Sequence, residues 1–294
     1  MYHRILIPLD GSKLAEQVFP AVLELAGPLN SEIIIMGACE ANAKEEGETC
    51  ALYLKDASRV LDSRLAGSTA TLKTEVLYGK PSEEILRYAQ DEKIDIIFMT
   101  SHGRSGIMPW SLGSTVDKVF KRTSVPLVVV KAREKVDKNS PSVYSRILIT
   151  LDGSDKSIAV LPYIRELAKI VDCEVFPIRV VEAGRHVRTI GGLDYIRYVE
   201  RDMSSTKDAV IKSLEEVCSD LAQTKAKVHC EVKTGEPAKE ILGYADDIDC
   251  TLIAMTSHGH HGMETWALGS VASKVVAVAK QSVLLVPSFI RKPE

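Results

Sequence analysis

An internal duplication constrains this chain more than any other feature. Residues 4–12 read RILIPLDGS and residues 146–154 read RILITLDGS. Two further blocks recur in the same order: TEVLYGKPSEEIL at 74–86 with CEVKTGEPAKEIL at 230–242, and MTSHGRSGIMPWSLGS at 99–114 with MTSHGHHGMETWALGS at 255–270. The first offset is 142 (146 − 4) and the later two are 156 (230 − 74), so the second copy carries 14 extra residues (156 − 142), which we place around 183–205. A repeat of this length is a whole domain.

The repeat predicts the domain organisation. We expect a first domain over residues 1–131, a linker over 132–145 and a second domain over 146–294. The linker segment, AREKVDKNSPSVYS, is rich in charge and has Asn-Ser-Pro at its centre, which is typical of an exposed connection. Each domain is long enough to bury a core of its own.

Apolar strand-like runs alternate with segments of helical spacing in each copy. Because these runs are nearly continuous rather than alternating with polar residues, they favour a parallel sheet covered on both faces. We therefore expect an α/β fold of two tandem doubly wound domains, each a five-stranded parallel sheet in the order 3-2-1-4-5. The strands expected in the first copy are Arg4–Leu9, Glu32–Cys39, Leu72–Leu77, Ile94–Thr100 and Val125–Val130. The helices expected there are Ser12–Gly27, ended by Gly27-Pro28, then Leu52–Leu65, Glu83–Asp91 and Ser114–Lys121.

Composition excludes several classes of protein. Lys plus Arg total 37 and Asp plus Glu total 40, so the net charge of −3 gives no electrostatic footprint for nucleic acid. The apolar runs are far shorter than the roughly 20 residues that span a membrane, so no membrane partner is expected. The chain starts directly as a strand, without the apolar segment of a signal peptide, and its six cysteines show no CxxC pair. These features predict reduced thiols and a cytoplasmic location.

Two loops in each copy follow strands that should end at the same edge of the sheet, where doubly wound folds bind ligands. The first is Asp10-Gly11-Ser12, repeated as Asp152-Gly153-Ser154. Asp10 and Asp152 either hydrogen-bond a ribose or base, or form the turn that caps the next helix. The second loop ends at Gly113-Ser114, where free amides at a helix start suit a phosphate. Alternatively, Ser114 and Asp117 form a capping box that needs no ligand.

The second loop resembles the signature of the universal stress protein family, G-x2-G-x9-G-S/T in its nucleotide-binding branch. The chain has Thr100-Ser-His-Gly103, nine residues, then Gly113-Ser114, and Thr256-Ser-His-Gly259, nine residues, then Gly269-Ser270. Thr100 and Thr256 stand where the family has its first glycine. The resemblance covers nearly the whole chain, once per copy, and the family also has an Asp at the end of its first strand.

The resemblance implies an adenine nucleotide, ATP or AMP with or without Mg²⁺, bound beyond the strand ends. The adenine would meet a residue near the end of the second strand, about Gly37 in the first copy and Val180 in the second. The nucleotide-binding residues implied are Asp10, Gly37, Met99, Thr100, Gly103, Gly113, Ser114 and Thr115, with Asp152, Val180, Met255, Thr256, Gly259, Gly269, Ser270 and Val271. The family also implies that Leu127–Val130 pairs with Val283–Val286 in an internal pseudo-dimer, with a homodimer of the chain as a further option.

These features favour a nucleotide-binding stress-response regulator without strong catalysis. No P-loop and no G-x-G-x-x-G appear, and no nucleophile is paired with a base, so no catalytic residue is assigned. The alternatives are a weak ATPase or autophosphorylating enzyme, and a scaffold of the same fold that binds partners but no nucleotide. His258, His260 and His261 form a cluster that we expect near solvent or phosphate rather than on a metal. The other residues considered are His102, which either contacts a phosphate or stabilises its turn, Arg104 as a phosphate contact, and Trp110 and Trp266 as packing anchors.

Overall fold

The computed structural model describes residues 1–39, 44–104, 106, 112–134, 141–182, 195–257 and 269–288, with the backbone alone at 44 and 195–207. The first half comprises β1 (Arg4–Pro8), the 3-10 helix η1 (Ala15–Val18), α1 (Phe19–Leu29), β2 (Glu32–Cys39), α2 (Lys44–Arg64), β3 (Thr71–Tyr78), α3 (Pro81–Asp91), β4 (Ile96–Thr100), α4 (Ser114–Arg122) and β5 (Leu127–Val130). The second half comprises β6 (Arg146–Leu151), the 3-10 helix η2 (Ser157–Val160), α5 (Leu161–Ile170), β7 (Glu174–Val181), α6 (Tyr195–Leu221), β8 (Lys227–Val228), β9 (Glu231–Thr234), α7 (Pro237–Asp247), β10 (Leu252–Thr256), α8 (Ser270–Val278) and β11 (Ser282–Val286). Of the predicted extra residues, 183–194 lie outside the described part and 195–205 begin α6.

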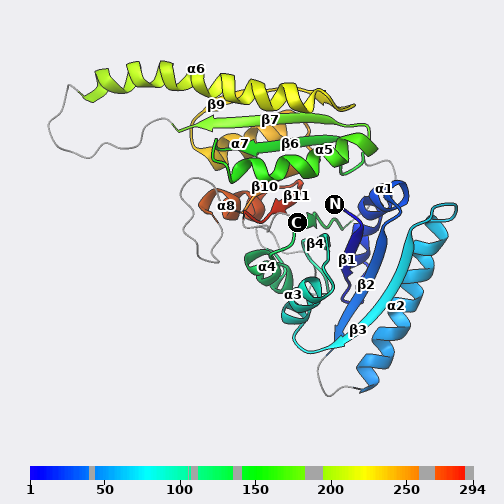
Figure 1. The fold of residues 1–294 in the computed structure, drawn as a ribbon. Helices are drawn as coiled ribbons and strands as arrows, with labels where there is room; N and C mark the ends of the chain where they lie inside the picture. The colour runs from blue at the N-terminus through cyan, green and yellow to red at the C-terminus, as the bar shows by residue number, and fades with distance from the viewer. Residues whose placement is uncertain are drawn as a thin grey trace.

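The described strands form one continuous sheet in the order β3-β2-β1-β4-β5-β11-β10-β6-β7-β8, with β9 also beside β7 (Figure 1). The order 3-2-1-4-5 predicted for the first half is confirmed, and its pairings are parallel. The two halves meet where β5 pairs antiparallel with β11, with Val128 opposite Leu284. This confirms the predicted pairing of the two fifth strands.

Helices cover both faces of the sheet, as the apolar strands require. On one face, α1, α2, α5 and α6 contribute Leu25, Leu54, Ile164 and Leu214 to a single buried cluster. On the other face, α3, α4, α7 and α8 contribute Ile85, Val119, Ile241 and Val275 to a second cluster. Because both clusters draw on strands of both halves, the two copies share one core on each face of the sheet.

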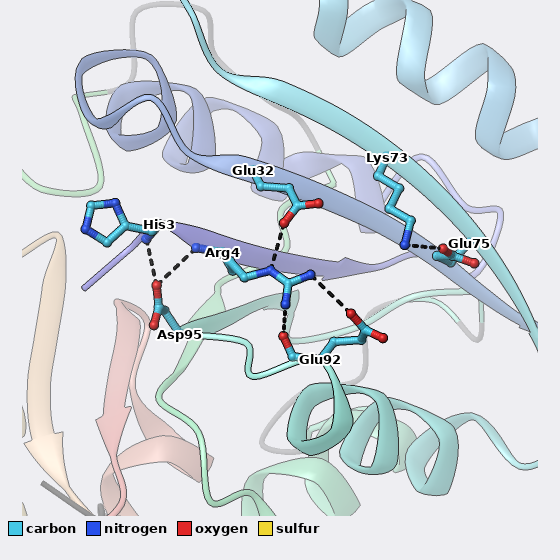
Figure 2. A network of polar contacts seen from close by, with 7 residues as sticks. All are labelled: His3, Arg4, Glu32, Lys73, Glu75, Glu92 and Asp95. Carbon is cyan, nitrogen blue, oxygen red and sulfur yellow. Dashed lines mark hydrogen bonds and ion pairs between the residues drawn. The ribbon is translucent and has the colours of Figure 1, made fainter. Parts of the chain in front are cut away.

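Arg4 anchors the amino-terminal edge of the sheet (Figure 2). Its guanidinium donates to the Glu32 carboxylate at 2.7 Å, and it also contacts the carbonyl of Glu92 and, at 3.2 Å, the Glu92 carboxylate. The Asp95 carboxylate accepts the amides of His3 and Arg4 at 2.8 and 3.0 Å. These contacts join β1 to β2 and to the segment before β4. They lie at the edge opposite the strands' carboxyl ends, so they hold the register of the sheet away from the predicted site.

Two buried tyrosines join the halves in a reciprocal way. The Tyr2 hydroxyl donates to the carbonyl of Tyr163 in the second half, and the Tyr144 hydroxyl donates to the carbonyl of Ala21 in the first, both at 2.9 Å. Positions 2 and 21 become 144 and 163 on adding the repeat offset of 142, so the contacts are equivalent. Burial raises the pKa of both phenols, which therefore remain neutral donors. Tyr144 is only 1% exposed, so the prediction of an exposed linker over 132–145 is wrong at this residue.

The first helix extends beyond its predicted end. Gly27-Pro28 was expected to stop it, but α1 continues to Leu29 and ends where Asn30 takes a left-handed conformation with φ 54°. Ser31 then donates its amide to the Ala26 carbonyl at 3.1 Å, which satisfies one of the last carbonyls of the helix. Pro28 is tolerated because it lies in the final turn, where its missing amide removes a single helical bond.

A proline interrupts the outer strand of the second half. The His229 amide donates to the Val175 carbonyl at 2.9 Å, and the next bond of a parallel ladder would come from residue 177. Pro177 has no amide hydrogen, so the expected third strand is divided into β8 and β9 around His229 and Cys230. At this break Cys230 forms a disulfide with Cys218 of α6, with 6.4 Å between the two Cα atoms. The expectation of reduced thiols is therefore wrong for this pair, whereas Cys39, Cys50, Cys173 and Cys250 are free.

We predict that this disulfide stabilises the second half. It closes a loop with a sequence separation of 12, and restricting such a loop in the unfolded chain contributes about 2–3 kcal/mol. Urea unfolding of the oxidised protein should therefore show a lower midpoint when a reductant is added. The double variant Cys218→Ser/Cys230→Ser should unfold at the lower midpoint with or without reductant. If the reductant does not change the urea midpoint of the unsubstituted chain, the prediction is contradicted.

Candidate functional site

A cavity of about 430 Å³ opens at the carboxyl edge of the first half, a volume in the range of small-molecule sites. It is lined by Pro8, Leu9, Asp10, Ala15, Met36, Ala38, Pro81, Ile85, Met99, Thr100, His102, Gly103, Arg104, Gly113, Ser114, Thr115 and Val116. The two loops predicted to face each other therefore border one space. Sequence reasoning did not assign Met36, Ala38, Pro81 or Ile85 to it. The recurring Gly-x-Pro before α3 and α7 was the available signal for the contribution of α3.

Asp10 ties the first loop to the second. Its Oδ1 accepts the Ser12 amide at 3.0 Å and the Ser12 hydroxyl at 2.6 Å, which is the turn that sequence reasoning offered as one alternative. Its Oδ2 accepts the amide of Arg104, beyond β4, at 2.6 Å. The carboxylate thus fixes the distance between the ends of β1 and β4 and shapes the mouth of the cavity.

Gly103 is a glycine because Asp10 lies directly against it. A Cβ built at Gly103 would overlap the Asp10 carboxylate. That carboxylate cannot move aside cheaply, since Ser12 and Arg104 hold both of its oxygens. The Arg104 guanidinium also holds the two loops together, because its Nε and Nη2 donate to the Asp10 carbonyl at 3.1 and 2.5 Å. Position 103 in the second loop therefore requires glycine, because the first loop approaches it so closely.

The start of α4 points amides at the cavity. Gly113 is the N-cap residue and its own amide donates to the Ser101 carbonyl at 2.8 Å. The first helical bond runs from the Asp117 amide to the Gly113 carbonyl, so the amides of Ser114, Thr115 and Val116 have no partner within the helix. Among the residues that the structure describes, no side chain caps this end, and Asp117 pairs with Lys121 at 2.8 Å instead. The capping-box alternative for Ser114 and Asp117 is therefore wrong, and the helix end offers an anion amides that have no partner within the helix, together with a favourable dipole.

The apolar wall of the cavity comes from β2, but from the face opposite Gly37. Met36 and Ala38 line the cavity, whereas a Cβ at Gly37 would overlap the Sγ of Cys50 in α2. Burial, together with the neighbouring Cys39 thiol, raises the pKa of Cys50 to about 12, so this thiol fills space as a neutral group. Sheet register pairs Pro8 with Met36 and Thr150 with Ile178, which makes Ala38 the counterpart of Val180. The resemblance treated Gly37 and Val180 as equivalent, but the residue that corresponds to Val180 is Ala38, one position further along β2.

The second half repeats the same two turns. Asp152 Oδ1 accepts the Ser154 amide at 2.9 Å and its hydroxyl at 2.6 Å. The Gly269 amide donates to the Ser257 carbonyl at 2.9 Å, and Gly269 is the N-cap of α8, so the amides of Ser270 and Val271 begin that helix. Met255 and Thr256 end β10 beside this point. Gly259, the histidines at 258, 260 and 261, and both Trp110 and Trp266 lie outside the described residues.

The comparison with known proteins agrees with the duplication. The model of the universal stress protein family matches residues 1–131 and again residues 144–287. The chain belongs to the universal stress protein family. The universal stress protein MJ0531 of Methanocaldococcus jannaschii is 33% identical over 149 residues, which cover 51% of this chain and 85% of that protein. The universal stress protein YxiE of Bacillus subtilis is 29% identical over 147 residues, 49% of this chain and 99% of that protein.

Solved structures of universal stress proteins share the complete two-copy fold. One from Archaeoglobus fulgidus matches with a TM-score of 0.65 at 20% identity, covering 97% of this chain and 96% of the other. A putative universal stress protein from Pseudomonas aeruginosa gives a TM-score of 0.73 at 12% identity, covering 97% and 93%. At these identities the likeness establishes the fold alone. Within the described ranges, no helix is both long and apolar enough to cross a membrane.

In this universal stress protein, Thr100 has a clear role where the family signature has glycine. Its hydroxyl donates to the His102 carbonyl at 2.7 Å, and the side chain is 5% exposed. His102 is buried beside it and its Nδ1 lies 3.1 Å from the Ser101 hydroxyl. The Ser101 hydroxyl also accepts the Ala132 amide at 3.0 Å. Thr100 and His102 therefore stabilise the loop that leads to the cavity.

Proposed function

We propose that this universal stress protein binds an adenine nucleotide, ATP or AMP, in one or both halves and acts as a regulator without strong catalysis. The observation that carries the proposal is the pair of opposed turns around one cavity. The amides at the start of α4 that have no partner within the helix belong to residues that line this space together with Asp10 and Arg104. Such an arrangement suits a ligand with an anionic tail and a polar centre.

The lining residues divide in the way that a nucleotide requires. The amides and hydroxyls of Ser114 and Thr115 would hold phosphate, with Gly113 allowing close approach. Met36, Ala38 and Ile85 form an apolar wall that suits a base, so Ala38 takes the role first assigned to Gly37. Asp10 would face the ribose. In the second half the corresponding residues are Asp152, Val180, Met255, Thr256, Gly259, Gly269, Ser270 and Val271.

We place binding ahead of hydrolysis. An ATPase or autophosphorylating enzyme would need a carboxylate to hold Mg²⁺ beside the phosphates, and sequence reasoning offered only Asp10 and Asp152. In both, Oδ1 already accepts two hydrogen bonds from the following serine of the turn. Among the described residues, no group of three or more His, Cys, Asp or Glu side chains is arranged to hold a metal ion. The nucleotide would act by binding two conformations or partner states with different affinity.

The deciding experiment is to denature the purified protein and identify the released small molecule by mass. We expect ATP or AMP, up to two per chain, and saturable rebinding of the same nucleotide in calorimetry. If nothing is released and neither nucleotide binds at millimolar concentration, the scaffold alternative holds. Phosphate release with Mg²⁺ that disappears in Asp10→Asn/Asp152→Asn would instead support the enzyme alternative.

A further inference from the structure

Both halves place a guanidinium group over the same glycine of the first turn. Gly11 and Gly153 are equivalent in the repeat and share a left-handed conformation, with φ of 85° and 82°. A Cβ built at Gly11 would lie 3.2 Å from Nη2 of Arg104. A Cβ built at Gly153 would overlap the guanidinium of Arg179. The two cations therefore lie over the same side of two matching turns.

The two arginines occupy unrelated positions in the repeat. Arg104 follows β4, whereas Arg179 belongs to β7, where it pairs with Leu151. The register makes Gly37 the first-half counterpart of Arg179, and Cys50 occupies the space where a side chain at Gly37 would begin. At the position of Arg104 the second copy has histidine in its sequence. The second half thus lacks an arginine at the position of Arg104, but it has Arg179 at a position where the first half has Gly37.

Each guanidinium is held by oxygens that carry no net charge. Arg104 donates to the Asp10 carbonyl, and Arg179 donates Nη1 to the Ser213 hydroxyl of α6 at 2.9 Å. These hydrogen bonds fix the direction of each guanidinium. Arg104 also lines the cavity that contains the start of α4. A positive group at that place is suited to the phosphates of a ligand bound there.

We propose that Arg179 replaces Arg104 in the second half, and that in each half this guanidinium selects ligands with a charged phosphate tail over the uncharged nucleoside. The inference rests on the proposed function, since it assigns a specificity residue to the same pair of sites. It also assigns the second half an anion-binding role, although that half has histidine where Arg104 stands in the first. The sites differ in which element supplies the cation and agree in where the cation lies.

The test uses the full chain with Arg104→Met, Arg179→Met and the double substitution. Each variant is titrated with ATP and with adenosine in calorimetry. We expect each single variant to weaken ATP binding at one of two sites by about tenfold to a hundredfold while adenosine binding is unchanged. The double variant should weaken both sites. Arg122→Met, which removes an exposed arginine at the end of α4 outside the cavity, is the matched control and should leave ATP affinity unchanged.

The other outcomes overturn the inference. An equal loss of ATP and adenosine affinity would show that the arginines support the turn without selecting charge. If Arg104→Met weakens one ATP site and Arg179→Met changes none, the replacement is wrong. If the unsubstituted chain binds none of ATP, AMP and adenosine, the proposed function itself fails, and this is seen before any arginine is changed.

Discussion

A chain carrying Gly103→Val should bind ATP in its first half several hundredfold more weakly, and it should unfold at a lower denaturant concentration. The new side chain must displace the Asp10 carboxylate, which accepts three hydrogen bonds from Ser12 and Arg104. At roughly 1 kcal/mol for each bond lost, the cost in folding free energy is about 3 kcal/mol. Calorimetric titration and urea unfolding measure the two effects separately.

A second substitution separates this mechanism from general misfolding. In a chain with Asp10→Ala, Gly103→Val has no carboxylate to displace, so most of its cost in stability should vanish while binding stays weak. Gly243→Ala is the matched control, because a Cβ there meets nothing within 4 Å. If Gly103→Val binds ATP as well as the unsubstituted chain does, the assignment of the first-half site is wrong.

Replacing both Tyr2 and Tyr144 with alanine should produce the largest loss of stability. Each ring is 1% exposed, and removing a buried aromatic side chain costs about 3–5 kcal/mol. The phenylalanine variants retain the ring and remove only the hydroxyl, so each should cost about 1 kcal/mol through the loss of the hydrogen bond that the phenol donates to a helix carbonyl of the opposite half. Chemical denaturation of the four single variants and the double variants gives these values.

The equivalence of the two tyrosine contacts provides the check on that prediction. Tyr2→Phe and Tyr144→Phe should cost similar amounts, because each removes the same bond across the junction of the halves. Tyr78→Phe is the control, since Tyr78 is 51% exposed at the end of β3. A large effect from one phenylalanine variant and none from the other would contradict the idea of matched contacts.

The repeat made the architecture predictable. Two copies of an alternating strand and helix pattern with apolar strands permit few sheet arrangements, and the first-half order and the β5–β11 pairing both follow the prediction. The loops that border the cavity were also found from sequence, because the Asp-Gly-Ser turn recurs in both copies and the spacing from Gly103 to Gly113 is repeated from Gly259 to Gly269. Such spacing is visible without any knowledge of tertiary contacts.

The features that sequence reasoning missed depend on long-range contacts. The burial of Tyr144 depends on α1, which lies more than 100 residues earlier in the chain. The division of the outer strand depends on Pro177 in the neighbouring strand rather than on the residues of β8 and β9 themselves. Whether Gly37 or Ala38 faces the cavity depends on a one-residue register, which single-sequence periodicity does not fix in a strand buried on both faces.

The antiparallel seam between β5 and β11 sends the carboxyl ends of the two halves to opposite rims of the common sheet. Two bound nucleotides would therefore lie at opposite edges of the sheet, so they could neither share a metal ion nor be bridged by one small ligand. Any influence of one on the other would have to travel through the intervening strands. Occupancy of one pocket should accordingly not change the affinity of the other unless the sheet itself changes its twist.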